Sequence, residues 1–484
     1  MNKEETNLKK LSIILSLIIL LFCTTAFVAC GEESVSGNES ATSVSESVGQ
    51  EDENAEKPTY SGTNKLRIGM WSGIPTEVDG KKLSDEELLG YYRDLAASGI
   101  TIASSAILYN SKEYNLRVLA AAEEVGIKQL IQDNDVTSVL FDVNGDQGDR
   151  EQKKNKLLAL SADYLGFKSF EGYFITDEPS RNYFEALGEG CEILKEALPD
   201  VAFYVNLLPD YASTAQLGNV TYRDYIDEYL DVIKTPYISY DYYVLSQDAR
   251  GNKKMKPTYL HNLATVKEFA ESYGVDMWTF GCTTEHMANS VRGVSNKADA
   301  AFQMYTSLAY GSRSMQWFCY WTPPLVAGDY NDAMIKRNGE KGVAYEFVSA
   351  VNGETQKFYH ILDESEWQGI LLSRGTEEAA GGSVNFDYVE DKQYALKNTD
   401  AIKGIKTSRD AIAGVYKDKS SRGVYMLANF ADPSLTGTNL VELTLNGKTH
   451  AVVWYKGEEK TLKAVGGKIT FELEPGEGAL VIPY

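Results

Sequence analysis

Histidine is scarce in this chain of 484 residues, which contains only four. They are widely separated along the sequence, at His261, His286, His360 and His450. Because a catalytic zinc ion usually takes several histidine ligands, this scatter argues against such a site. We therefore predict that the protein binds no metal.

Several other features are missing. The spacing of Cys191, Cys282 and Cys319 indicates neither a metal site nor a disulfide framework. No glycine-rich phosphate loop follows the first predicted strand, and no Gly-x-Ser-x-Gly motif joins a strand to a helix. These absences argue against a nucleotide-binding fold and against a serine hydrolase, and we expect no cofactor.

Positive charge is in deficit. The chain has 47 Lys and Arg residues against 69 Asp and Glu residues, which gives a formal net charge of −22. Such an acidic surface repels phosphate backbones, and no basic patch offsets it. We therefore expect no nucleic-acid partner.

The N-terminus carries an export pattern. Lysines are followed by an apolar run from Leu11 to Phe22 and then by Phe27-Val28-Ala29-Cys30-Gly31. The run is shorter than the ~20 residues that a membrane-spanning helix needs, which favours cleavage. The last five residues resemble the bacterial lipoprotein box, although Phe27 stands where leucine is commoner. The resemblance implies removal of residues 1–29 and a lipid anchor at Cys30, on the extracytoplasmic face of the cell membrane. A simple signal peptide or a signal anchor is the alternative.

Residues 30–61 are rich in Ser, Glu, Asn and Gly, and no aromatic residue occurs in them before Tyr60. This segment cannot bury enough apolar surface to fold. We predict a disordered acidic tether that holds the folded part away from the membrane.

From residue 62 to residue 363, short apolar runs alternate with longer segments of helical period. This pattern is typical of a parallel sheet wrapped in helices. The eight strand candidates are Leu66 to Trp71, Ile100 to Ile107, Lys128 to Gln132, Gly172 to Thr176, Ala202 to Leu207, Tyr237 to Tyr242, Asp276 to Gly281 and Ser314 to Tyr320. The helix candidates include Ser84 to Ala97, Leu116 to Val125, Arg181 to Leu198 and Lys297 to Tyr310. Ser84 with Glu87 forms a predicted capping box. Eight such units predict a (β/α)8 barrel.

Residues 364–484 have a different character, with strands punctuated by Gly, Asn and Asp. The candidates are Val424 to Phe430, Val441 to Leu445, Ala451 to Tyr455 and Lys468 to Leu473. Asn446-Gly447 between two of these runs predicts a β-hairpin. We expect an all-β sandwich domain that supports the barrel, with sugar binding as the alternative role.

Polar and aromatic side chains gather where the barrel strands end, which is where the chemistry of such a barrel lies. The predicted substrate-binding residues are Trp71, Asp177, Asn206, Asp241, Tyr243 and Trp321. Cleavage of a glycosidic bond requires this mixture, because one carboxylic acid protonates the leaving oxygen while a second carboxylate acts across the sugar. Aromatic rings stack on the apolar faces of sugars. Asp133 and Asp135, by contrast, are expected to form hydrogen bonds within a loop.

The fourth strand candidate ends in Thr176-Asp177-Glu178-Pro179. This run resembles the motif of clan A glycoside hydrolases, including the family 42 β-galactosidases, which place an Asn-Glu or related pair here. The eighth strand candidate, continuing through Trp321 to Pro323, shares the resemblance. It implies that Glu178 is the catalytic acid/base. Asp177 departs from the usual Asn, whose amide contacts a sugar hydroxyl, although Asp could accept the same hydrogen bond.

The same clan places its nucleophile at the end of the seventh strand, where Glu285 is the nearby carboxylate. Glu285 is therefore the predicted second catalytic residue, and Asp241 at the end of the sixth strand is the alternative. A separation of about 5 to 5.5 Å between the two carboxyl groups would indicate a retaining enzyme, and about 6.5 to 9.5 Å an inverting one.

Together these features predict an O-glycosyl hydrolase, similar to β-galactosidases, that acts on an extracellular oligo- or polysaccharide and retains the anomeric configuration. The alternative is a noncatalytic glycan-binding surface lipoprotein on a degenerate barrel. In that case Glu178 would face no second acid within about 10 Å.

Overall fold

The computed structural model describes residues 56–105, 111–142, 145–286, 290–324, 330–377 and 383–484. The predicted leader, the lipidation residue Cys30 and nearly all of the predicted tether lie outside these ranges. Within them, no helix combines the length and the apolar character needed to cross a bilayer.

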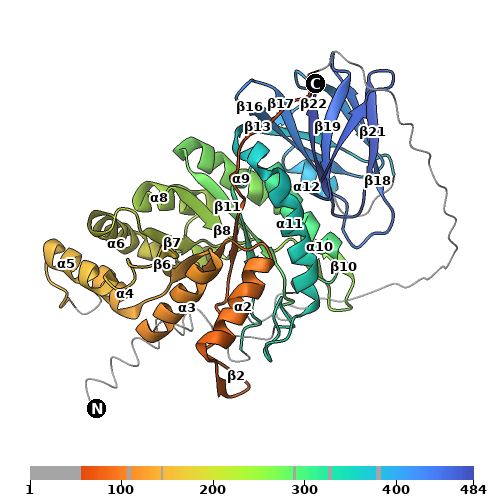
Figure 1. The fold of residues 1–484 in the computed structure, drawn as a ribbon. Coiled ribbons are helices and arrows are strands. Elements are labelled where there is room, and N and C mark those ends of the chain that lie inside the picture. The colour runs from red at the N-terminus through yellow and green to blue at the C-terminus, as the bar shows by residue number, and fades with distance from the viewer. Residues whose placement is uncertain (1–55, 106–110, 143–144, 287–289, 325–329, 378–382) are drawn as a thin grey trace.

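Eight parallel strands form the barrel (Figure 1). In chain order they are β1 (Arg67–Met70), β4 (Ile102–Ser104), β5 (Lys128–Ile131), β6 (Phe170–Asp177), β7 (Ala202–Asn206), β8 (Tyr237–Tyr240), β11 (Asp276–Cys282) and β12 (Ser314–Phe318). The sheet order is β7-β6-β5-β4-β1-β12-β11-β8. A parallel bridge from Leu207 to Tyr240 joins its two ends, and the Leu207 amide donates to the Ser239 carbonyl at 2.9 Å. Each predicted run overlaps one of these strands, so the predicted barrel is confirmed.

Helices connect the strands and cover the outside of the barrel. They are α2 (Asp85–Ala97), α3 (Lys112–Val125), α4 (Asn134–Phe141), α5 (Arg150–Ser161), α6 (Phe184–Ala197), α7 (Thr214–Leu217), α8 (Tyr222–Ile233), α9 (Tyr259–Tyr273), α10 (Lys297–Ala309) and α11 (Val343–Asp363). The capping box of α2 is confirmed, because Ser84 Oγ accepts from the Glu87 amide and the Glu87 carboxylate accepts from the Ser84 amide. Helix α6 starts at Phe184, after a 3-10 turn over Arg181–Tyr183.

The C-terminal part contains two sheets, as predicted. The larger has the order β14 (Ala395–Leu396), β13 (Ser365–Ser373), β16 (Ala411–Asp418), β17 (Gly423–Asn429), β22 (Gly478–Pro483), β19 (His450–Tyr455) and β20 (Glu458–Lys463). The smaller contains β15 (Ile402–Thr407), β18 (Asn439–Leu445) and β21 (Lys468–Leu473). A separate hydrophobic core fills the space between the sheets.

The hairpin predicted at Asn446-Gly447 is wrong. Strand β18 pairs with β15 and β21, whereas β19 pairs with β20 and β22, so the turn carries the chain from one sheet to the other. Leu443 of β18 and Val453 of β19 belong to the same buried core. The two strands face each other across this core instead of lying side by side, and a local turn signal cannot distinguish these arrangements.

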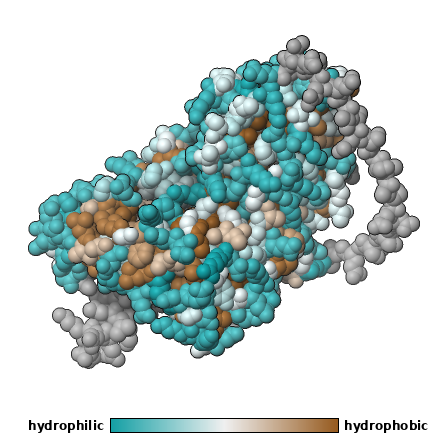
Figure 2. All heavy atoms as spheres, in the orientation of Figure 1, coloured by the Kyte–Doolittle hydropathy of each residue, from teal (hydrophilic) through white to brown (hydrophobic). Residues whose placement is uncertain are grey.

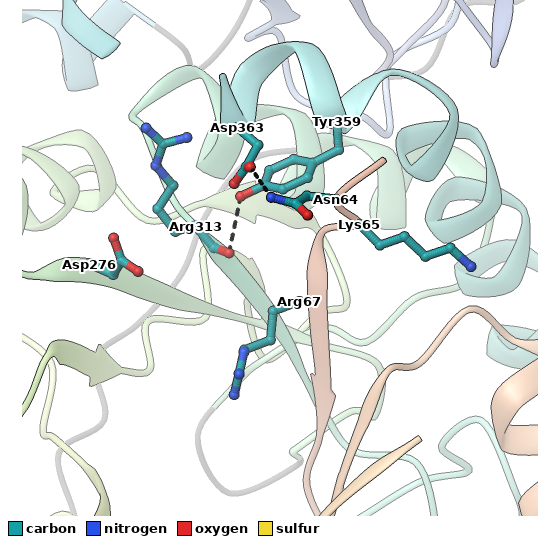
Figure 3. A pocket seen from close by; sticks show the side chains of 7 residues that line it. All are labelled: Asn64, Lys65, Arg67, Asp276, Arg313, Tyr359 and Asp363. Carbon is teal, nitrogen blue, oxygen red and sulfur yellow. Dashed lines mark hydrogen bonds between the residues drawn. The ribbon is translucent and has the colours of Figure 1, made fainter. Parts of the chain in front are cut away.

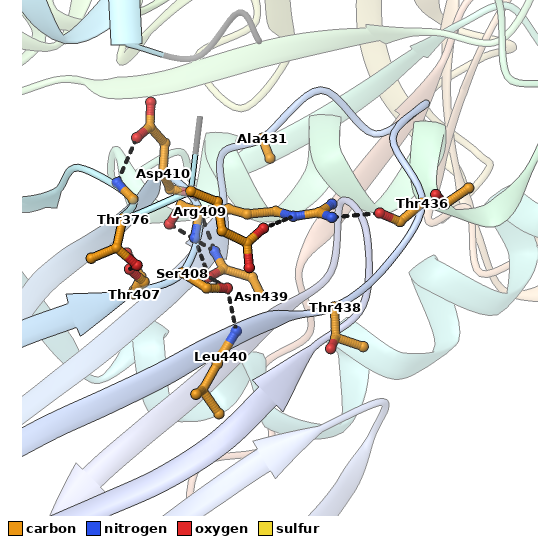
Figure 4. Close-up of polar contacts among 12 residues, drawn as sticks. Thr376, Thr407, Ser408, Arg409, Asp410, Ala431, Thr436, Thr438, Asn439 and Leu440 are labelled. Atoms are coloured by element: carbon orange, nitrogen blue, oxygen red, sulfur yellow. Dashed lines mark hydrogen bonds and ion pairs between the residues drawn. The ribbon is translucent and has the colours of Figure 1, made fainter. Parts of the chain in front are cut away.

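Asn439 joins segments of the sandwich that are distant in sequence (Figure 4). Its Oδ1 accepts from the Arg409 amide at 2.9 Å, and its Nδ2 donates to Asn429 Oδ1 at 3.2 Å. Asn439 and Asn429 are fully buried. Their bonds satisfy polar groups that would otherwise destabilise the core.

Helices α10 and α11 lie between the barrel and the sandwich (Figure 1). The Trp367 indole N–H donates to the Ala309 carbonyl at 3.0 Å. Lys297 of α10 forms ion pairs with Glu354 of α11 at 2.7 Å and with Glu477 of the sandwich at 2.9 Å. On the face drawn in Figure 2, hydrophobic side chains gather mainly over the barrel, and the sandwich surface is mostly hydrophilic. The contacts of α10 and α11 join the sandwich to the barrel, and the supporting role of the sandwich stays a prediction.

Candidate active site

Three adjacent strands end in polar side chains at one rim of the barrel. Strand β6 ends at Asp177 and is followed by Glu178 and Pro179, β7 ends at Asn206, and Asp241 follows β8 directly. The Glu178 amide donates to the Asn206 carbonyl at 2.8 Å, which holds the residue against β7. Glu178 has a φ of 45°, a strained value for a non-glycine residue and one that is often found at functional sites.

A chain of buried hydrogen bonds orients the Asn206 amide. Gln316 Nε2 donates to Ser239 Oγ at 2.8 Å, and Ser239 Oγ donates to Asn206 Oδ1 at 3.0 Å. Because Asn206 Oδ1 accepts this bond, its Nδ2 is directed to the carboxylates. It donates to Asp177 Oδ1 at 3.2 Å and to Asp241 Oδ1 at 3.1 Å. The amide thus bridges two acids on neighbouring strands.

The three acids perturb one another. Burial and the negative charges of Asp241 and Asp177 raise the pKa of Glu178 well above its ordinary value. Burial, together with the charge of Asp241, raises the pKa of Asp177 to about 8. Burial also raises the pKa of Asp241, but the hydrogen bond from Asn206 opposes this rise because it favours the charged form.

The Glu178 side chain is exposed to solvent, although the surrounding barrel is close enough to desolvate its carboxyl group. Asp241 and Asn206 are nearly inaccessible, with exposed fractions of 6% and 3%. A ligand that enters from solvent would meet Glu178 first.

Loop residues that the sequence did not single out lie near these acids. Burial is the largest cause of the raised pKa of Tyr211, and the charges of Asp241 and Glu178 raise this pKa further. Burial is also the largest cause of the raised pKa of Tyr330, to which the charges of Asp177 and Glu178 contribute. Lys256 Nζ lies 3.8 Å from the centre of the Tyr211 ring. The only feature of the sequence that could have indicated Tyr211, Tyr330 and Lys256 is their position in loops that follow barrel strands.

Glu285 has a different environment. It lies three residues beyond the end of β11, and its two carboxylate oxygens accept hydrogen bonds from the side-chain amides of Gln247 and Asn331. It thereby connects the loops that follow β8, β11 and β12. The charge of Asp241 acts on Glu178, whereas the carboxylate of Glu285 accepts from these two loop side chains.

The three predicted aromatic residues are all more than nine-tenths buried. Trp71 packs edge-to-face on Phe174 inside the barrel, with ring centres 4.7 Å apart. Tyr243 also belongs to the barrel interior. Trp321 packs against Tyr91 of α2 and belongs to the core between the barrel and its helices.

Asp133 caps helix α4, where it accepts from the Asp135 and Val136 amides at 2.9 and 3.3 Å, and it accepts from the Tyr164 hydroxyl at 2.6 Å. Its predicted hydrogen-bonding role is confirmed. Across the described ranges, no group of three or more His, Cys, Asp or Glu side chains has an arrangement that could hold a metal ion.

A cavity of about 460 Å³ lies at the opposite end of the barrel, where the strands begin (Figure 3). Arg67, Asp276 and Arg313 line it at the starts of β1, β11 and β12. Asn64 donates to Asp363 at 2.7 Å there. Because catalytic groups of such barrels lie at the ends of the strands, this cavity is outside the candidate site.

No protein-family model matches the sequence, and no curated protein is significantly similar to it. The chain is distantly similar in structure to glycoside hydrolases. A solved glycoside hydrolase is 11% identical, with 86% of this chain and 92% of that one covered and a TM-score of 0.49. The α-amylase of Geobacillus thermoleovorans, solved with acarbose, is 9% identical, with coverages of 87% and 98% and a TM-score of 0.48. The β-galactosidase of the psychrophilic Marinomonas ef1 is 10% identical, with coverages of 68% and 66% and a TM-score of 0.46.

Proposed function

We propose that this protein hydrolyses O-glycosidic bonds, with Glu178 as the acid/base and Asp241 as the second catalytic carboxylate. The observation that carries the proposal is the cluster of Asp177, Glu178 and Asp241 at the ends of β6 and β8, in which Asn206 donates to both aspartates and the charge of Asp241 helps to raise the pKa of Glu178. A protonated acid beside an ionised carboxylate is the combination that glycoside hydrolysis requires. The same pair argues against the noncatalytic alternative, in which Glu178 would lack an acidic partner.

The proposed mechanism is retaining, as the resemblance to clan A implies. It requires about 5 to 5.5 Å between the two carboxyl groups, whereas an inverting enzyme needs about 6.5 to 9.5 Å to admit a water molecule. Glu178 would protonate the glycosidic oxygen as the bond from that oxygen to the anomeric carbon breaks. Asp241 would attack the same carbon and form a glycosyl ester. Glu178, now ionised, would take a proton from a water molecule that attacks this carbon and releases Asp241.

Asp177 has a supporting part in this proposal. With a pKa raised to about 8, its carboxyl group is largely protonated at neutral pH and can donate a hydrogen bond to a sugar hydroxyl as well as accept one. A β-galactosidase-like activity on an extracellular glycan is the finer form of the proposal. We further propose export and a lipid anchor at Cys30, from the N-terminal sequence alone.

A substrate screen tests the function directly. The purified protein without residues 1–29 is incubated with a panel of oligo- and polysaccharides and aryl glycosides, and released sugars are measured by chromatography. Hydrolysis of at least one glycan, with retention of configuration by NMR, is expected. Binding of a glycan without hydrolysis would support the noncatalytic alternative instead.

The pH dependence of kcat/KM provides a second test. Glu178 must be protonated to act as the acid, and Asp177, which is ionised above about pH 8, helps by its negative charge to raise the pKa of Glu178. The variant Asp177→Asn removes that charge, so the pKa of Glu178 falls and activity is lost at a lower pH on the alkaline side. The exposed residue Asp200 lies before β7, at the other end of the barrel, and Asp200→Asn is the control that leaves the profile unchanged. An alkaline limb that stays in place in Asp177→Asn contradicts the proposed coupling.

A further inference from the structure

Lys256 places a positive charge beside the candidate catalytic acids. It follows β10 (Lys253–Met255), which forms a small hairpin with β9 (Leu245–Gln247) in the connection between β8 and α9. The lysine is half-buried, and its ammonium lies 3.8 Å from the ring centre of Tyr211 and 5.6 Å from that of Tyr242. The charge of Asp241 acts on Lys256, so the ammonium belongs to the surroundings of the catalytic pair.

This cation lacks an anionic partner. In the portion of the chain that the structure describes, no Asp or Glu carboxylate forms an ion pair with Lys256, although Asp241 and Asp210 are close enough to act on its charge. Burial lowers the pKa of Lys256 to about 8, so the side chain is still charged at neutral pH. A partly desolvated charge without a counter-ion is costly unless a ligand supplies one. The faces of Tyr211 and Tyr242 compensate only part of this cost.

The main chain of Lys256 is held in place from two sides. Its amide donates to the Val244 carbonyl at 2.9 Å, and its carbonyl accepts from Asn385 Nδ2 at 3.2 Å. Asn385 belongs to α12 (Ser383–Asp387) of the sandwich, and its Oδ1 also accepts from the Leu260 amide at 3.1 Å. The sandwich therefore helps to position a cation at the rim of the barrel, and a preorganised group loses little entropy when a ligand binds.

We propose that Lys256 is an anion-binding residue of the active site and that the substrate is a glycan whose sugars carry carboxylate or sulfate groups. This inference rests on the proposed function and names its substrate class. Because Lys256 forms no ion pair with a carboxylate of the described residues, its ammonium is available to bind a carboxylate or sulfate group of a sugar. The Tyr211 ring beside Lys256 offers an apolar face to the same sugar.

Matched substrates and variants test the inference. kcat/KM is measured for pairs of aryl glycosides that differ only in a carboxylate or a sulfate, such as a glucoside, its glucuronide and its 6-sulfate. The wild type should prefer an anionic member, and the carboxylate and sulfate arms show which group is recognised. Lys256→Met should lower kcat/KM on that member by roughly 10- to 100-fold more than on the neutral glycoside, the usual contribution of a charged hydrogen bond. Lys256→Arg should restore part of the preference.

Lys254→Met is the matched control, because Lys254 is exposed and pairs with Asp248 outside the site. It should behave as the wild type does. Preference for the neutral glycoside, or an equal loss on both members in Lys256→Met, would overturn the inference while leaving glycoside hydrolysis intact.

If no glycoside is cleaved, the proposed function fails and calorimetric titration decides the inference separately. Oligouronides, sulfated oligosaccharides and neutral oligosaccharides of equal length are titrated into the wild type and Lys256→Met. Stronger binding of an anionic glycan that is lost in Lys256→Met supports the inference. Absence of binding, or equal binding by both proteins, overturns it.

Discussion

Replacing Glu178 with glutamine will lower kcat/KM by about 10²- to 10⁴-fold on natural glycans, which is the usual contribution of a general acid. Glutamine keeps the shape of the side chain but cannot protonate the glycosidic oxygen. On an aryl glycoside whose leaving group needs no proton, the loss will be far smaller. Steady-state kinetics on both substrate types measure this difference.

The proper comparison for Glu178→Gln is Glu185→Gln, a change of the same kind at an exposed position on α6. This control should keep wild-type rates on both substrates. Because Glu178 is itself exposed and its amide, not its side chain, bonds to Asn206, the substitution should leave the fold intact in circular dichroism. Equal turnover of both substrates by Glu178→Gln and the wild type would remove Glu178 from the mechanism.

The barrel was predictable because its signals are local. A run such as Tyr237–Tyr240 is short, apolar and rich in aromatic and β-branched residues, and the helices between such runs have a clear period. Pairing between strands is not local, which explains the error at Asn446-Gly447. The turn residues predict a change of direction correctly, but the core residues on both sides decide that the chain crosses to the other sheet.

In the candidate site, the sequence could identify the acids but not their partners. Asp177, Glu178 and Asp241 occur directly at strand ends, where the barrel geometry brings side chains together. The choice between Asp241 and Glu285 depended on loop contacts. Gln247 and Asn331 are far from Glu285 in sequence, and no periodic pattern indicates that they bind its carboxylate. Lys256 was missed for the same reason, because it reaches the site from a hairpin inserted between β8 and α9.

Because Asp241 and Glu285 have different surroundings, we expect the largest loss of kcat/KM when Asp241 is replaced. Asp241→Ala should reduce kcat/KM by on the order of 10⁴-fold or more, as the loss of a covalent nucleophile does in other hydrolases. Glu285→Gln should have a much smaller effect, because glutamine can still form hydrogen bonds with Gln247 and Asn331. The reverse pattern would transfer the nucleophile to Glu285. Circular dichroism must accompany the kinetics, since Asp241→Ala removes one of the two carboxylates that accept from Asn206 Nδ2.

Added azide distinguishes a nucleophile from a residue that only orients its neighbours. Alanine at position 241 leaves space beside the anomeric carbon, and azide in that space can attack an activated aryl glycoside directly. The expected product is a glycosyl azide of inverted configuration, detected by NMR, together with a partial recovery of rate. Because the wild type should retain configuration through two displacements, a single displacement by azide must invert it. Recovery with a retained product, or no recovery in a folded variant, would show that Asp241 positions Glu178 and does not attack the sugar.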